Sequence, residues 1–180
     1  YNTFIGTKIA FVNSVMEMCH HLPNTNVDEV MNALKMCNKR IISDKYLSGG
    51  MGDGGGCHPR DNIALSWLSD KLDMSFNWFD NIMKQREVQT DWLADIIEYN
   101  KKGKVVILGK SFKPETNIET GSPAHLLANI LRERNVSFEH YDPYVDGDFE
   151  IGYEACTFFI ATKHEDFNDI DYPKGSVIID

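Results

Sequence analysis

The stretch YNKKGKVVILG, residues 99–109, decides the fold, because the character of the sequence changes within it. Its polar first half closes a region whose apolar residues recur at helical spacing. Its second half, KVVILG at 104–109, is a short β-branched run that ends in glycine, as buried strands of parallel sheets do. We therefore predict an all-helical domain over residues 1–100 and an α/β domain over residues 101–180.

The segments after residue 109 support the α/β assignment. A loop leads to the amphipathic run SPAHLLANILRERN, which is typical of a helix, and three strand-like runs follow at 137–143, 157–162 and 176–180. An order of β, α, β, β, β favours a Rossmann-like parallel sheet with a crossover helix.

The segments before residue 99 predict four helices. Apolar residues at steps of three and four fill residues 2–21, Asn26 is a start signal for a helix over 27–36, and Pro59 suits the first turn of a third helix that ends near residue 72. The fourth, at 74–99, carries more tryptophan and aliphatic residues than one facing helix would bury. We therefore expect a homodimer through this helical domain.

Composition excludes several classes of protein. Asp and Glu number 27 against 18 Lys and Arg, and the net charge of −9 argues against nucleic-acid partners and anionic membranes. No apolar run approaches the ~20 residues of a membrane span. The four cysteines form no CxxC pair, so neither a zinc site nor a disulfide framework is predicted, and a reducing cytoplasm fits best. Cys19, Cys37 and Cys156 are expected in the core.

The glycine segment GMGDGGGCHPRD, residues 50–61, is the main functional signal. It follows no strand and contains no GK[ST], so it is a poor phosphate loop, and Cys57 with His58 lacks a second ligand pair, so no metal site is predicted. A plain glycine-rich turn and a nest around a reactive thiol remain as alternatives.

The position of Cys57 favours the reactive thiol. It precedes Pro59 by two residues and so belongs to a helix N-terminus, where unpaired N–H groups and the helix dipole favour a thiolate. The upstream glycines leave the sulfur open to a substrate. Asp61 follows in the first turn and can handle a proton or hold a water, which completes the parts of covalent catalysis.

The order of these features carries a resemblance. Its members here are Asn2, Asn13, Arg40, Tyr46, Leu47, Gly50, Gly52, Gly54, Gly55, Cys57, Pro59, Arg60, Asp61, VVILGKSFK and YDP. Over nearly the whole chain they resemble the UDP-glucose/GDP-mannose dehydrogenase family of nucleotide-sugar dehydrogenases. The cysteine motif is the specific part of this pattern.

The resemblance implies oxidation of the C6 hydroxymethyl of a nucleotide sugar, UDP-glucose being the first choice, to a carboxylate while two NAD molecules are reduced. Cys57 would take the intermediate aldehyde as a thiohemiacetal and carry the later thioester. Asn2 would hydrogen-bond the oxyanion or the hydrolytic water, and Asp61 would support general base chemistry.

The resemblance also implies binding residues. The substrate-binding set is Arg40, Tyr46, Leu47, Gly54, Phe112 and Lys113, the cofactor contact is Arg60, and His58 lines the site without being a ligand. Arg40 corresponds to an arginine that reaches the sugar of the neighbouring subunit, and Phe112 with Lys113 to the entry of the UDP-binding face. Taken alone, without the resemblance, Lys113 would be interpreted as a solvated loop lysine and Tyr46 as a packing residue.

The resemblance places the NAD-binding domain and a catalytic lysine ahead of residue 1, and further basic residues of the UDP site after residue 180. The chain is then the central helical domain and an incomplete UDP-binding domain, inactive by itself. Asp53, Arg60 and NIETGSP at 117–123 depart from the family pattern and leave the sugar open. The alternative is a non-catalytic module that binds a UDP-sugar or mediates dimerisation.

Overall fold

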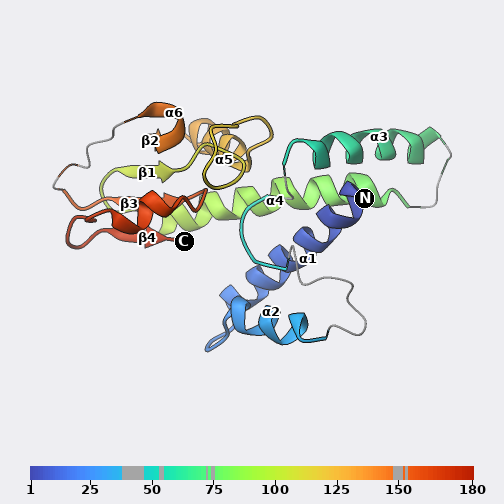
Figure 1. The fold of residues 1–180 in the computed structure, drawn as a ribbon, viewed down its shortest axis with the longest axis horizontal. Helices are drawn as coiled ribbons and strands as arrows, with labels where there is room; N and C mark the ends of the chain where they lie inside the picture. Colours follow the sequence, from blue (N-terminus) through green and yellow to red (C-terminus); the bar gives the residue numbers. More distant parts are fainter. Residues whose placement is uncertain (38–46, 53–54, 72, 74–75, 148–151, 153) are drawn as a thin grey trace. The chain divides into compact units, whose positions relative to one another are not determined.

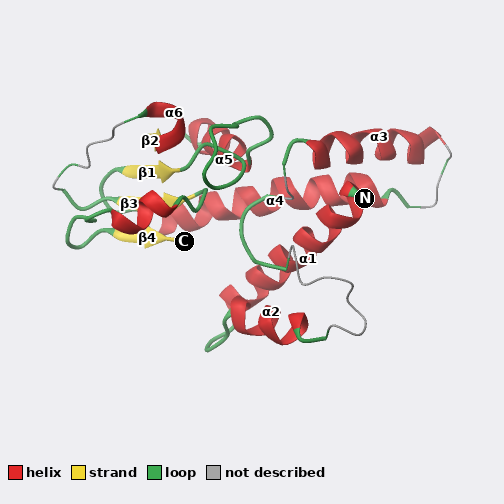
Figure 2. Cartoon of the chain, viewed as in Figure 1, coloured by secondary structure: helices red, strands yellow, loops and turns green. Residues whose placement is uncertain are grey.

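The computed structural model describes residues 1–37, 47–52, 55–71, 73, 76–147, 152 and 154–180. Within them, helices occupy the first hundred residues and a parallel sheet with helices the rest (Figures 1 and 2), which confirms the predicted mixed fold. The chain divides into two compact units, Tyr1–Gln89 and Thr90–Asp180, with the division inside a long helix. The domain boundary at residue 100 stays a prediction.

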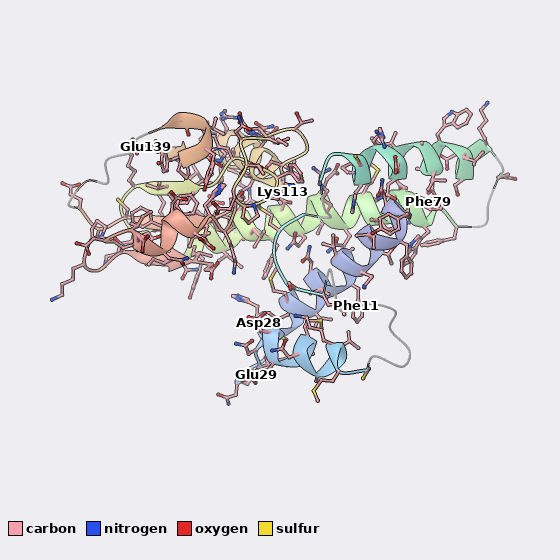
Figure 3. All side chains as sticks on the ribbon, in the orientation of Figure 1. Phe11, Asp28, Glu29, Phe79, Lys113 and Glu139 are labelled. Carbon is pink, nitrogen blue, oxygen red and sulfur yellow. The ribbon has the colours of Figure 1, made fainter. Side chains whose placement is uncertain are left out.

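The first two helices, α1 (Asn2–His21) and α2 (Val27–Lys35), pack around a small apolar core. Asn26 begins α2 as predicted, because its side chain accepts the N–H groups of Asp28 at 2.7 Å and Glu29 at 3.3 Å. Both acids lie in the first turn of α2 (Figure 3). The core between α1 and α2 consists of Val12, Met31 and Leu47.

The next two helices are α3 (Cys57–Lys71) and α4 (Trp78–Tyr99). The start of α4 lies four residues later than predicted. The Asn77 side chain accepts the Asp80 N–H at 3.1 Å, which makes Asn77 the N-cap and stops the helix from extending backwards. The Nδ2 of Asn77 donates in turn to α3, at the hydroxyl of Ser66 and the carboxylate of Asp70.

The second unit contains the sheet. Its elements in chain order are β1 (Val105–Leu108), α5 (Pro123–Glu133), β2 (Phe138–Tyr141), α6 (Pro143–Asp146), β3 (Thr157–Ile160), the 3-10 helix η1 (Glu165–Asp169) and β4 (Val177–Ile179). In the described residues the strands are parallel and lie in the order β2-β1-β3-β4, from top to bottom in Figure 1. The short α6 and η1 were not predicted, since a single turn leaves no periodic pattern.

Both faces of the sheet are covered. Val106 and Leu108 of β1 pack with Phe158 and with Phe167 of η1 on one face. Val105 and Ile107 alternate to the other face and are equally buried. The crossover helix α5, with a continuous buried stripe from Pro123 to Leu131, connects β1 to β2. Strand order therefore reverses between β1 and β3, and the carboxyl ends of these strands meet at the kind of edge where α/β folds bind ligands.

The second half of α4 is tied to α5 by one arginine. Arg134 donates to the carboxylates of Asp91, Asp95 and Glu98 at 2.6–2.7 Å. Hydrogen bonds to Asp95 and Glu98, more than the charge of Asp91, raise the pKa of Arg134 well above its ordinary value. None of the helices in the described residues is long and apolar enough to cross a membrane.

Candidate active site

The predicted nucleophile lies where the sequence placed it, at the start of a helix. Cys57 is the first residue of α3 and is exposed, and Pro59 lies in the first turn. The His58 N–H donates to the carbonyl of Gly55 at 3.0 Å, which closes the turn ahead of the helix. The thiol thus stands beside the N–H groups of the first helical turn, which have no partner within a helix.

Asn2 and Asp61 are brought together from opposite parts of the helical unit. The Asn2 Nδ2 donates to Asp61 Oδ2 at 2.7 Å, although 59 positions separate the two residues. The other carboxylate oxygen accepts from Nε and Nη2 of Arg60 at 3.0 and 2.9 Å. The start of α1 and the start of α3 therefore share one carboxylate, one turn away from Cys57.

These contacts set the charge of the group. The Asn2 hydrogen bond, and then those of Arg60, hold the pKa of Asp61 below its ordinary value. The hydrogen bond and charge of Asp61, with a smaller contribution from Cys57, raise the pKa of Arg60. Asp61 is therefore an ionised acceptor at neutral pH. Its low pKa makes it better suited to orienting a water or a thiol than to holding a proton itself.

The glycine segment is held from two helices. Asn13 of α1 donates to the Gly52 carbonyl at 2.6 Å, and Gln89 of α4 donates to the Gly50 carbonyl at 3.0 Å. Both amide side chains are buried, 1% and 2% exposed. Asn13 belongs to the family-like pattern of the sequence, but Gln89 was missed, because a glutamine within an amphipathic helix looks like a surface residue.

Two predicted substrate-binding residues, Phe112 and Lys113, lie in the second unit, on the loop between β1 and α5. Lys113 is exposed and Phe112 half-buried, and the Lys113 Nζ lies 5.5 Å from the centre of the Phe112 ring. Figure 3 labels Lys113 on this loop. The loop leaves the carboxyl end of β1, next to the point where the strand order reverses.

The structure places two residues differently from the prediction, and several others lie outside the described part of the chain. The Leu47 side chain is 3% exposed and fills the core with Val12 and Met31, so a nucleotide contact at residue 47 would have to come from its backbone. The expectation that Cys37 is a core residue is wrong: it follows the end of α2 and is exposed, whereas Cys19 and Cys156 are half-buried. Arg40, Tyr46 and Gly54, with Asp53, lie outside the described residues.

In the part of the chain that the structure describes, no group of three His, Cys, Asp or Glu side chains is arranged to hold a metal ion. Arg60, the predicted cofactor contact, is 70% exposed while Nε and Nη2 bind Asp61. Its contact with a cofactor stays a prediction.

Comparison with known proteins now decides the family. The model of the UDP-glucose/GDP-mannose dehydrogenase family, central domain, matches residues 1–102. The chain belongs to this family. The recognition from the cysteine motif is thereby confirmed.

Curated dehydrogenases match most of the chain. UDP-glucose 6-dehydrogenase of Rickettsia conorii is 25% identical over 206 residues, which cover 99% of the chain and 47% of the relative. UDP-glucose 6-dehydrogenase YwqF of Bacillus subtilis is 29% identical over 147 residues, covering 79% of the chain and 32% of the relative. The chain thus spans less than half the length of these dehydrogenases.

Solved structures of family members have the same fold. UDP-D-ManNAc dehydrogenase from Pyrococcus horikoshii aligns with a TM-score of 0.75 at 23% identity, over 99% of the chain and 49% of that structure. GDP-mannose dehydrogenase from Pseudomonas aeruginosa aligns with a TM-score of 0.65 at 21% identity, over 98% and 47%. The names of these relatives include three different sugars, so the family by itself leaves the sugar open.

Proposed function

We propose that this chain is the central and carboxyl-terminal part of a nucleotide-sugar dehydrogenase that oxidises the C6 hydroxymethyl of UDP-glucose to a carboxylate. The observation that carries the proposal is the group at the start of α3, where Cys57 lies one turn from a carboxylate bound by Asn2 and Arg60. The UDP-glucose 6-dehydrogenases among the relatives support glucose as the sugar.

In this reaction NAD accepts the two hydrides, and the chain's own residues handle the carbon between the two transfers. The Cys57 sulfur bonds to C6 of the aldehyde and the thiol proton passes to the new oxygen, which gives a thiohemiacetal. Loss of the second hydride and of the hydroxyl proton leaves a thioester. Water then attacks its carbonyl carbon, the carbon–sulfur bond breaks, and the thiol and the carboxylate product are released.

Asp61 and Asn2 suit the hydrolytic step. An ionised carboxylate with a low pKa accepts a hydrogen bond from the attacking water and fixes its direction. The Asn2 amide, already bonded to Asp61, is a donor of the type that stabilises an oxyanion. The positive charge of Arg60 offsets the negative charges of Asp61 and of the Cys57 thiolate as it forms. Arg60 also stays a candidate contact for NAD.

The nucleotide is proposed to bind in the second unit. The loop from β1 to α5 leaves the sheet at its ligand-binding edge and presents Phe112 and Lys113, an aromatic ring and a cation suited to a base and a phosphate. Arg40, Tyr46 and Gly54 remain proposals from the family pattern.

We also propose that the protein is a homodimer through the helical unit. Large apolar side chains on its helices are exposed in the single chain, among them Phe4, Trp67 at 61% and Trp78 at 49%. A second copy would bury them. Sedimentation that shows a clean monomer at micromolar concentration would contradict this.

The catalytic proposal is tested by paired cysteine variants in the full-length enzyme. With UDP-glucose and NAD, Cys57→Ser should form the carboxylate product much more slowly than the wild type. The reason is that the serine oxygen is a poorer nucleophile and a poorer leaving group than the cysteine sulfur. Cys37→Ser is the matched control, since Cys37 is exposed too but lies away from the glycine segment in sequence. Normal turnover in Cys57→Ser would show that Cys57 is not the nucleophile and would return the segment to a plain turn.

A further inference from the structure

The β1–α5 loop is held by a buried pair, a carboxylate and an imidazole, that the proposed chemistry does not use. The side chains of Asp142, at the end of β2, and His164, after β3, are fully buried, and His164 Nε2 lies 3.0 Å from Asp142 Oδ2. A buried ion pair or polar pair is weak evidence for stability, because desolvation offsets the attraction. A role in fixing geometry explains its presence better.

Asp142 holds the loop on the amino-terminal side of Phe112. Its Oδ2 accepts the backbone N–H groups of Lys110 at 2.7 Å and Ser111 at 3.0 Å, and the Ser111 hydroxyl at 3.1 Å. Its Oδ1 accepts the Tyr144 N–H at 2.9 Å. Burial raises the pKa of Asp142, but the hydrogen bonds from these backbone groups outweigh it, and the net pKa lies below the ordinary value.

His164 holds the loop on the other side of Lys113. Its Nδ1 accepts the backbone N–H of Glu115 at 3.1 Å, so this nitrogen carries no proton and Nε2 must be the donor to Asp142. The Tyr144 ring stacks on the imidazole with centres 4.8 Å apart. One buried pair therefore fixes both Ser111 and Glu115, the residues that flank the exposed tip.

Glu115 is itself in an unusual conformation. Its φ of +56° lies in the left-handed region that residues other than glycine seldom adopt. Its carboxylate accepts the Tyr144 hydroxyl and, at 3.0 Å, the N–H of Glu165. A strained backbone held by its surroundings on every side is typical of a functional loop.

We propose that Asp142 and His164 are positioning residues for nucleotide binding, which act through Phe112 and Lys113 by fixing the loop at Ser111 and Glu115. The inference rests on the proposed function of the loop as the UDP site. The tip, residues 112–114, is short, both of its ends are fixed, and the Phe112 N–H donates to the Ile118 carbonyl at 2.9 Å, so the backbone of the tip has little freedom to move. Phe112 and Lys113 then meet the nucleotide without an entropic cost of ordering the loop.

Two substitutions of His164 separate the bond at Nδ1 from the contacts at Nε2, which reach Asp142 and, at 3.1 Å, the Ser111 hydroxyl. His164→Gln places an amide nitrogen near the position of Nε2 and keeps the donor to Asp142, but leaves the Glu115 N–H without its acceptor. His164→Asn places an oxygen near Nδ1 and keeps that acceptor, but loses the donor to Asp142. We expect UDP binding by the full-length enzyme, measured by calorimetry, to weaken about tenfold in His164→Gln, the size of one lost hydrogen bond, and less in His164→Asn.

A double-mutant cycle distinguishes positioning from a general effect on stability. In the background of Phe112→Ala and Lys113→Ala, His164→Gln should weaken UDP binding no further, because the side chains that it positions are gone. Hydrogen exchange should show faster exchange of the Glu115 amide in His164→Gln and near-normal exchange in His164→Asn, a readout that needs no ligand.

The outcomes are distinct. If the full-length wild-type enzyme fails to bind UDP, the proposed nucleotide site is wrong and the inference falls with it. If the wild type binds but His164→Gln binds equally well, or weakens binding to the same extent in the double-alanine background, only the positioning role is wrong. If His164→Gln does not fold, Asp142→Asn takes its place. A normal hydrogen-exchange rate of the Glu115 amide together with a normal UDP affinity in Asp142→Asn would then overturn the proposal.

Discussion

Replacing Gly109 by alanine tests how closely β1 and β3 must approach at the proposed nucleotide edge. Gly109 follows β1 directly, and its φ is +101°. A Cβ at this position would lie 2.5 Å from the Thr162 Cβ and 2.6 Å from the Thr162 backbone nitrogen. The Gly109 N–H donates to the Tyr141 carbonyl at 2.7 Å, so the residue cannot move aside without losing a bond to β2.

The cost has two parts. An alanine at positive φ is strained by about 1–3 kcal/mol. The contacts with the Thr162 Cβ at 2.5 Å and the Thr162 backbone nitrogen at 2.6 Å must open by more than half an ångström, and overpacking of this kind costs a further ~1–3 kcal/mol. We therefore expect the free energy of unfolding to fall by roughly 4 kcal/mol, a large part of the ~5–15 kcal/mol of a typical domain.

Gly147→Ala is the matched control. Gly147 has φ +81°, but no atom of the residues that the structure describes lies within 4 Å of the Cβ that alanine would add. It therefore carries the backbone strain without the contact. Alanine also restricts the unfolded chain, and this effect cancels between the two variants. The difference between them isolates the approach of β1 to Thr162.

The measurement is urea unfolding of the chain by circular dichroism, with hydrogen exchange in β1 and β3 to assign the loss to the sheet edge. Gly109→Ala should lose about 1–3 kcal/mol more than Gly147→Ala. Equal losses of unfolding free energy in the two variants would show that Thr162 moves aside at little cost. They would refute the claim that this edge of the sheet is rigid, on which the positioning of the nucleotide loop depends.

Three further predictions concern charges. In the full-length enzyme, Asn2→Ala removes the main cause of the low pKa of Asp61, so the acid limb of the pH profile of kcat should move to higher pH; an unmoved limb would contradict the role of Asp61 as an ionised acceptor. Arg134→Gln should lower the free energy of unfolding by about 1–2 kcal/mol, with faster hydrogen exchange in the second half of α4, because three partly exposed ion pairs are lost. Burial lowers the pKa of His140, so the unfolded state binds its proton first and stability should fall as the pH drops below about 6.5; His140→Asn should flatten this slope, and an unchanged slope would rule the residue out.

The fold class could be predicted from sequence because its signals are local. The β-branched run before Gly109, the amphipathic periods and the Asn26 cap act over a few residues, and the structure has each of them. Cys57 at a helix start followed in the same way from Pro59 two residues later. The late start of α4 was also within reach, since asparagine is a strong N-cap and Asn77 stands just before the helix.

Only the tertiary structure decided which polar side chains pair when the two residues are far apart in sequence. Asn2 meets Asp61 across 59 positions, and Asp142 meets His164 across 22. Gln89 turns inward to a glycine carbonyl from a helix whose pattern predicts a surface position. A hydrogen bond requires its two atoms to lie within about 3 Å at a suitable angle. Periodicity and composition fix neither the distance nor the angle, because both depend on how whole helices and strands pack.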